Sequence, residues 1–185
     1  MKCFVAVVLL SLAVACAQPQ AVERPAEAGT SPAAFAPLPF TADEIRAAHP
    51  DGTMLKFLMQ RAGADDAVQV MKFSGANAEG TTVASAMQTP DGTPLGDAPS
   101  ARATWTELRD HASFEAAQTE IGEASTKVRA GSYECMVYRV QREGGVVQEF
   151  HFAKSKPGPP VLMLVRQAGE EMLRMELVEY QRGSN

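Results

Sequence analysis

Short stretches of alternating apolar and polar residues, separated by turn residues, constrain this chain more than any other feature. They begin after Gly52, and none shows the sustained 3.6-residue period of a long helix. The segments between them carry Gly, Pro and Asn, the residues that favour tight turns. The pattern predicts eight strands, at residues 54–60, 67–74, 81–88, 120–128, 133–141, 146–153, 161–165 and 172–180.

Two short helices are predicted at positions where a threonine precedes a glutamate by three residues. Thr41 with Glu44 and Thr104 with Glu107 match the capping box, in which each side chain satisfies the other residue's backbone N–H group. Pro50 ends the first helix near residue 49. We therefore expect a mostly β domain, a single curved antiparallel meander sheet of half-barrel form with two short helices.

The predicted strand faces carry more apolar surface than two short helices would cover. Strands 133–141 and 161–165 are apolar on both faces. In strand 172–180, Arg174 and Glu176 point away from the apolar face, so we expect cover on one face only. The chain also holds nine methionines, which suit irregular apolar sites. The excess of apolar strand surface predicts either a fully packed core or an apolar groove. The groove would be lined by Met136, Tyr138, Met163, Leu173 and Met175.

The N-terminus has the three-part layout of a secretory signal peptide. Lys2 supplies the positive charge, residues 4–12 are uncharged and apolar, and Ala13-Val14-Ala15 provides small residues for cleavage. The apolar run is too short to span a bilayer, which requires about 20 residues. We therefore expect residues 1–15 to be removed on export from a bacterial cytoplasm.

The sequence around Cys16 predicts a lipid anchor. Leu12-Ala13-Val14-Ala15-Cys16 is similar to the lipobox of bacterial lipoproteins, although Leu12 lies one position too early. That resemblance implies acylation of Cys16 and, with Ala17 next to it, sorting to the outer membrane, facing the periplasm. Ordinary cleavage after Ala15 or Ala17 is the alternative, and it would give a soluble periplasmic or secreted protein.

Composition divides the remaining chain into a spacer and one domain. Residues 16–39 are rich in Ala and Pro with no hydrophobic period, as expected of an extended tether. Residues 40–182 are long enough for one β-rich globular domain with a single core, and residues 183–185 form a short tail.

Charge and cysteine content narrow the classes of partner. The net charge is −5 and there is no cluster of Lys and Arg, which argues against nucleic acid and against electrostatic docking on anionic lipid. Only three cysteines occur, and two of them, Cys3 and Cys16, lie in the export signal. A disulfide framework is therefore not expected.

No catalytic centre, metal site or cofactor site is recognisable. The three histidines are isolated in sequence, so we expect them to face solvent or cap helices, and Cys135 to be a buried, inert thiol. Glu176 and Glu179 are expected on opposite faces of their strand, a poor arrangement for an acid–base pair. Gly-x-Ser-x-Gly, P-loop and dinucleotide motifs do not occur.

Five segments resemble a family of exported, β-rich bacterial envelope proteins. They are TADEIR (41–46), TWTELRDH (104–111), AGSYEC (130–135), PGPPV (157–161) and MELVE (175–179). The resemblance covers about residues 40–182 and implies export and a β-rich fold, but no particular activity. A more remote likeness, at the level of fold, is to the half-barrels that carry lipoproteins through the periplasm.

Three functions are consistent with these features. The leading one is a non-enzymatic envelope lipoprotein, an interaction or structural module that docks a protein partner. The first alternative is a carrier of an apolar ligand or acyl chain in the concavity of the sheet, and the second is an enzyme. An open edge strand or an outer apolar patch would favour the interaction module, and a hollow interior would favour the carrier. A cleft with convergent polar groups would favour the enzyme.

Overall fold

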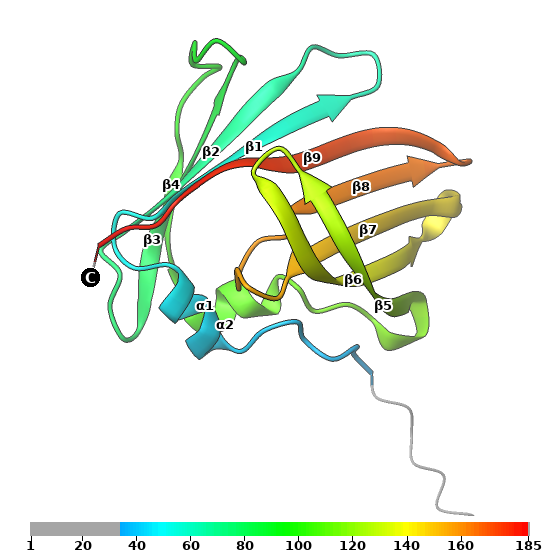
Figure 1. Ribbon diagram of the computed structural model, residues 1–185, viewed down its shortest axis with the longest axis horizontal. Helices are drawn as coiled ribbons and strands as arrows, with labels where there is room; N and C mark the ends of the chain where they lie inside the picture. The colour runs from blue at the N-terminus through cyan, green and yellow to red at the C-terminus, as the bar shows by residue number, and fades with distance from the viewer. Residues whose placement is uncertain (1–33, 185) are drawn as a thin grey trace, which may run out of the picture. The chain divides into compact units, whose positions relative to one another are not determined.

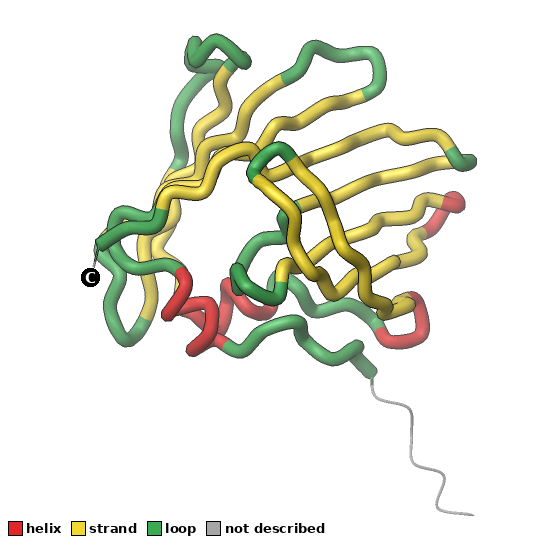
Figure 2. The backbone as a smooth tube through the Cα atoms, viewed as in Figure 1, coloured by secondary structure: helices red, strands yellow, loops and turns green. Residues whose placement is uncertain are grey.

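The computed structural model describes residues 34–184 of the chain, and strands make up most of its regular structure (Figure 2). The helices are α1 (Ala42–Ala48) and α2 (Trp105–Asp110), with short 3-10 helices η1 (Ala116–Gln118) and η2 (Glu143–Gly145). The strands are β1 (Met54–Arg61), β2 (Ala67–Ser74), β3 (Gly80–Gln88), β4 (Ser100–Thr104), β5 (Thr119–Val128), β6 (Gly131–Arg142), β7 (Val146–Ala153), β8 (Leu162–Gln167) and β9 (Glu170–Gln181).

The strands form one antiparallel sheet in the order β4-β3-β2-β1-β9-β8-β7-β6-β5 (Figure 1). The edge strands β4 and β5 do not pair with each other, so the sheet stays open. This confirms the predicted fold class, a mostly β chain with a single antiparallel sheet and two short helices. The meander is interrupted once, because β1 pairs with β9 and the chain passes from one edge of the sheet to the other between β4 and β5.

Both predicted capping boxes are present. The Thr41 backbone N–H donates to Glu44 Oε2 at 2.8 Å, and the Glu44 N–H donates to Thr41 Oγ1 at 3.2 Å. Thr104 and Glu107 repeat the arrangement at the start of α2. In each case the two side chains bind backbone donors that have no partner within the helix.

Strand β4 was not predicted from the sequence. Its five residues are mostly exposed, and it pairs with β3 alone. A short edge strand needs no apolar face of its own, so it lacks the alternation that identified the other strands.

Cross-strand partners place the apolar side chains on two faces, because paired residues point to the same side of a sheet. We call the side against which α1 and α2 pack the helical face. Its core residues include Leu55, Phe57, Phe73, Tyr138, Phe152 and Leu177. The opposite side carries Leu58, Val68, Leu162 and Leu164.

The β5–β6 hairpin curls over that opposite side, which we call the hairpin face; Figure 1 shows the hairpin in front of β7–β9. The N–H of Ala130, at the hairpin tip, donates to the Leu177 carbonyl of β9 at 3.1 Å. Thr126 on β5 reaches His151 on β7, two strands away, at 2.7 Å between Oγ1 and Nδ1. Such contacts between non-neighbouring strands require a strongly curled sheet.

Two expectations for strand β9 are wrong. Glu176 is buried on the hairpin face beneath the hairpin, with Arg129 at 2.8 Å, so at this residue the strand is covered on both faces. Val178 forms a bulge opposite the Lys56/Phe57 step, and this extra residue shifts the alternation. Glu176 and Glu179 consequently lie on the same face, which an ideal strand would not allow.

The last residues of the predicted tether pack against the domain. The Ala36 N–H donates to the Phe114 carbonyl at 2.8 Å, and the Tyr138 hydroxyl donates to the Pro37 carbonyl at 2.8 Å. Ala36 and Phe40 are buried in the same aromatic cluster. The predicted signal peptide, Cys16 and the rest of the tether lie outside the described residues. Within residues 34–184, no helix is long and apolar enough to cross a membrane.

Candidate functional site

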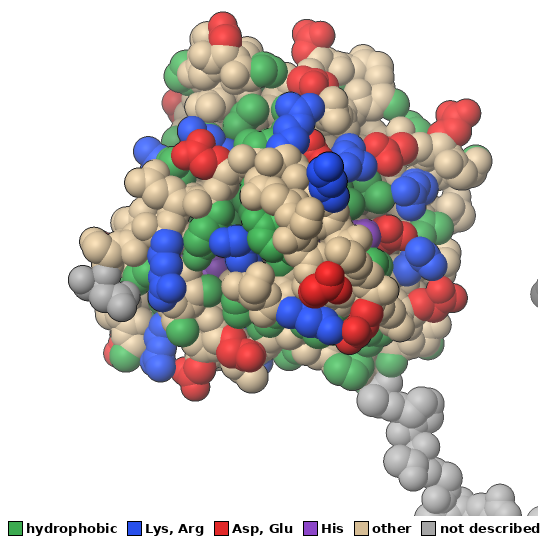
Figure 3. Space-filling model, viewed as in Figure 1, with side chains coloured by type: hydrophobic (Ala, Val, Ile, Leu, Met, Phe, Trp, Pro, Cys, Tyr) green, Lys and Arg blue, Asp and Glu red, His purple; other side chains and the backbone are tan. Residues whose placement is uncertain are grey.

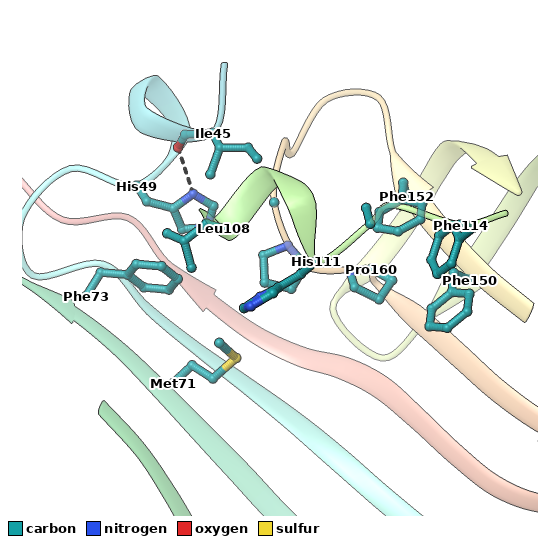
Figure 4. A pocket seen from close by; sticks show the side chains of 13 residues that line it. Ile45, His49, Met71, Phe73, Leu108, His111, Phe114, Phe150, Phe152 and Pro160 are labelled. Carbon is teal, nitrogen blue, oxygen red and sulfur yellow. Dashed lines mark hydrogen bonds between the residues drawn. The ribbon is translucent and has the colours of Figure 1, made fainter. Parts of the chain in front are cut away.

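A half-open apolar cavity of about 210 Å³ lies between the two helices and the helical face of the sheet (Figure 4). Met71 and Phe73 of β2 line one side, and Phe150 and Phe152 of β7 line the other. The helices and the segments that follow them contribute Ile45, His49, Leu108, His111, Ala112 and Phe114, and the turn before β8 contributes Gly158, Pro159 and Pro160.

The turn at residues 157–160 makes room for His49. Gly158 has a φ of +137°, a conformation that side-chain-bearing residues rarely adopt. A Cβ atom at this position would lie 2.4 Å from Cε1 of His49 and 3.0 Å from its Nε2. The glycine is therefore required where the backbone passes directly over the imidazole ring.

His49 is 1% exposed and has one unpaired nitrogen. Its Nδ1 lies 2.9 Å from the Ile45 carbonyl, the bond drawn in Figure 4. Burial lowers the pKa of the ring, and the hydrogen bond to Ile45 only partly opposes this effect. The imidazole is thus neutral at neutral pH, and Nε2 has no hydrogen-bond partner among the described residues.

The five residues predicted to line an apolar groove all lie on the helical face, since their cross-strand partners place them there. None of them lines the cavity. Tyr138 is fully buried in the aromatic cluster, and the other four are partly buried: Met136, Met163, Leu173 and Met175.

The hairpin face holds a buried chain of polar side chains. The Thr126 hydroxyl meets His151 Nδ1 at 2.7 Å, and His151 Nε2 meets Glu149 Oε1 at 2.8 Å. Arg139 then donates to Glu149 Oε2 at 2.9 Å. Although burial disfavours the charged carboxylate, the hydrogen bonds from His151 and Arg139 outweigh it and hold the pKa of Glu149 below its usual value.

The series Thr126, His151 and Glu149 has the order of a hydroxyl nucleophile, a base and an acid, as in hydrolytic triads. Thr126, however, is only 5% exposed and is not among the residues that line the neighbouring cleft of about 310 Å³. Both ring nitrogens of His151 are paired, so the arrangement is that of a network joining β5, β6 and β7. Acidic and basic side chains are interspersed on the surface seen from this side (Figure 3).

The expectation that the histidines face solvent or cap helices holds for two of the three. His111 is exposed at the end of α2, and His49 caps α1 although it is buried. The expectation is wrong for His151, which is buried in the middle of β7. The spacing of Glu149 and His151 is the signal that could have identified the pair, because residues i and i+2 share one face of a strand.

Cys135 is 1% exposed on the hairpin face, and burial raises the pKa of its thiol. Its sulfur lies 3.5 Å from the Tyr133 carbonyl. In the described part of the chain, no three His, Cys, Asp or Glu side chains gather closely enough to hold a metal ion.

No protein-family model and no curated protein matches the chain. Among solved structures it is similar to the MucA/MucB complex of Pseudomonas aeruginosa, with a TM-score of 0.50 and 11% identity over 77% of this chain and 56% of the matched one. MucB in complex with MucA(peri) matches with a TM-score of 0.49 and 12% identity, over the same shares of the two chains. MucB alone matches with a TM-score of 0.48 and 13% identity, over 77% of this chain and 57% of the matched one.

The chain thus spans little more than half the length of the structures it matches. At 11% identity, the first of these likenesses concerns the fold and not the activity. What the comparisons establish for this chain is a β-rich fold similar to that in the MucA/MucB complex.

Proposed function

We propose that this chain is an exported, lipid-anchored module of the cell envelope that acts by binding a protein partner and not by catalysis. The signal-peptide pattern of residues 1–15 and the lipobox at Cys16 support export and membrane anchoring. The fold supports the mode of action, because MucB, which has a similar fold, occurs in complex with MucA.

The observation that carries the proposal is the open edge of β5. Its ten residues pair with β6 along one side, and no described strand pairs with the other side. The opposite edge strand, β4, has only five residues. A long unpaired edge offers a row of backbone donors and acceptors to an added strand, and Ile121, 47% exposed, offers an apolar contact beside them.

Site-specific photo-crosslinking in the cells that make the protein tests this surface. A photoreactive phenylalanine analogue at Ile121 should give a discrete adduct with one partner protein. The same analogue at Met172, which is 40% exposed on β9, is the matched control and should give none. No adduct at residue 121, or equal adducts at both positions, would refute docking at this edge.

The anchor is tested separately. Cells fed an alkyne-bearing fatty acid should label the wild-type chain and the Cys3→Ser control, and Cys16→Ser should lose the label and leave the membrane fraction. One acyl chain binds membranes only marginally, so firm anchoring requires the two or three that a lipobox cysteine receives. Equal labelling of Cys16→Ser and the wild type, or equal release of both into the soluble fraction, would refute acylation of Cys16.

A second candidate function, binding of a small apolar ligand, is favoured by the cavity on the helical face. Its walls are mostly aromatic and aliphatic, and the helices leave it partly open. A protein partner at β5 and a ligand in this cavity use different surfaces, so the two functions are compatible.

A further inference from the structure

We infer that the partner strand at the β5 edge carries a tyrosine or a tryptophan, whose side chain enters the cleft of the hairpin face above Gly122. The inference rests on the proposed function, docking of a protein partner at this edge, and names the side chain by which the partner is recognised. Three features of the structure support it: the course of the cleft, the empty space at Gly122 and the chemistry of the walls.

The cleft of about 310 Å³ follows the backbone of β5. Five consecutive residues of this strand, 120–124, line it, together with Val137 and Arg139 of β6 and Glu149 and His151 of β7. Alternate residues of a strand point to opposite faces, so five in a row line one cleft only where it reaches the backbone. A strand added to this edge would therefore border the cleft.

Gly122 lies in the middle of this stretch, where the backbone has no need for glycine. Its φ is not positive, and β5 pairs with β6 in unbroken register from Thr119 to Val128, so there is no bulge at this point. A Cβ atom at Gly122 would meet no atom within 4 Å. Glycine inside a strand costs stability and is typical of places where a ligand or another chain approaches closely. The missing side chain leaves space that a partner can fill.

A side chain of the added strand would point into this space, because residues opposite each other on paired strands point to the same face. Gly122 pairs with Val137, which pairs with His151, so all three lie on the hairpin face. The floor of the cleft is small and apolar, formed by Gly122, Ala124 and Val137. An aromatic side chain opposite an edge glycine covers the exposed backbone and pins the register. The volume admits a ring, since about 150 Å³ is enough for benzene.

The walls select an aromatic ring that carries a hydrogen-bond donor. Glu120, Arg139 and Glu149 are consecutive cross-strand neighbours on the hairpin face. An ionised carboxylate can only accept hydrogen bonds, and a tyrosine hydroxyl or a tryptophan N–H can donate one while the ring covers the apolar floor. A guanidinium such as that of Arg139 also attracts the face of an aromatic ring. Phenylalanine and leucine have no donor for the carboxylates.

Photo-crosslinking from residue 121, in cells that express the full-length chain, tests the inference. Gly122→Leu fills the space from the chain's own side, and the open surroundings of a Cβ atom there accept the substitution without a clash. The adduct should fall about tenfold or more, the loss expected when a buried aromatic anchor is excluded. The urea midpoint should not fall, because glycine is unfavourable inside a strand.

Ser125→Leu is the matched control. Ser125 is exposed on the same strand, but it lies an odd number of positions from Gly122 in the unbroken register, and hence on the opposite face. An added leucine there should leave the adduct unchanged. Equal loss in both variants would show that any bulky residue disturbs the edge, and would overturn the assignment to the cleft.

A second measurement keeps the inference testable if Gly122→Leu does not fold. Mass spectrometry of the wild-type adduct identifies the partner segment that reacts with residue 121, and a tyrosine or tryptophan should be adjacent or next but one to the reacting residue. Replacing that aromatic residue of the partner by alanine should reduce the adduct about tenfold. A crosslinked segment with neither tyrosine nor tryptophan at these positions would overturn the inference.

The same experiment separates this inference from the function on which it rests. If the wild-type chain gives the adduct and Gly122→Leu gives it undiminished, the partner docks at β5 without using the cleft, and only the aromatic contact is refuted. If the wild-type chain gives no adduct, both the docking at β5 and the aromatic contact are refuted.

Discussion

His49 and His151 are both buried, at 1% and 8% exposure, yet their surroundings differ. His151, on the hairpin face, uses both ring nitrogens in a network with Thr126 and Glu149. His49, on the helical face, uses one nitrogen and leaves the other buried and unpaired beneath the Gly158 backbone. Burial alone therefore does not identify a functional histidine; the pairing of each nitrogen does.

The same contrast extends to the two faces. On the hairpin face, charged and polar groups are matched by partners, which suits a network that holds the curled hairpin in place. On the helical face, aromatic packing leaves a space and an unpaired acceptor. The first arrangement favours stability and the second favours binding, so substitutions should affect the two faces differently.

The largest effect is expected from His151→Leu. The substitution leaves the Thr126 hydroxyl without its partner in the core and removes one of the bonds to Glu149, so the free energy of unfolding should fall by about 3 kcal/mol. Urea denaturation measures it. A loss below about 0.5 kcal/mol would show that the network is not structural, and would revive a catalytic role for its hydroxyl and base.

Cys135→Ala should have the next largest effect, about 1–2 kcal/mol, through lost burial and a small cavity. In a chain with Cys3→Ser and Cys16→Ser, the remaining Cys135 should react with a thiol reagent far more slowly than a free thiol, because burial raises its pKa. Labelling at the rate of a model thiol would contradict the buried, inert assignment.

Acid should destabilise the domain through His49 over a defined range. Its folded pKa is lowered, so below the unfolded value of about 6.5 the unfolded chain binds a proton that the folded chain does not. Stability is thus complete above that pH and falls as pH decreases toward the folded pKa, by at most about 1.4 kcal/mol per pH unit. Urea midpoints between pH 8 and pH 5 should decline less in His49→Leu than in the wild type.

The smallest effect is expected from His49→Leu at pH 8, about 0.5 kcal/mol or less in either direction. The Ile45 carbonyl still accepts the backbone N–H of residue 49 at 3.1 Å, and the substitution removes an unpaired acceptor from the core. A loss as large as that of His151→Leu would show that the two rings are equivalent structural elements, and would remove the contrast between the faces.

Local patterns predicted local structure well. The capping boxes at Thr41 and Thr104 involve only residues three apart, so the sequence contains all their information. Strand alternation located every strand except β4, whose residues are mostly exposed. It failed for Glu176 and Glu179 because the bulge at Val178 arises from pairing with β1, more than a hundred residues away in the chain.

The sequence by itself determined the class of fold, the two helix starts and the faces of most strands, because these depend on neighbours within a few positions. Only the tertiary structure decided that β1 pairs with β9, that the β5–β6 hairpin curls onto β9, and that Gly158 passes over His49. Cavities and hydrogen-bond partners form between segments distant in sequence, and whether a buried nitrogen is paired depends on which of those segments meet it. For that reason both candidate sites, the cavity at His49 and the network at His151, became visible only in the folded chain.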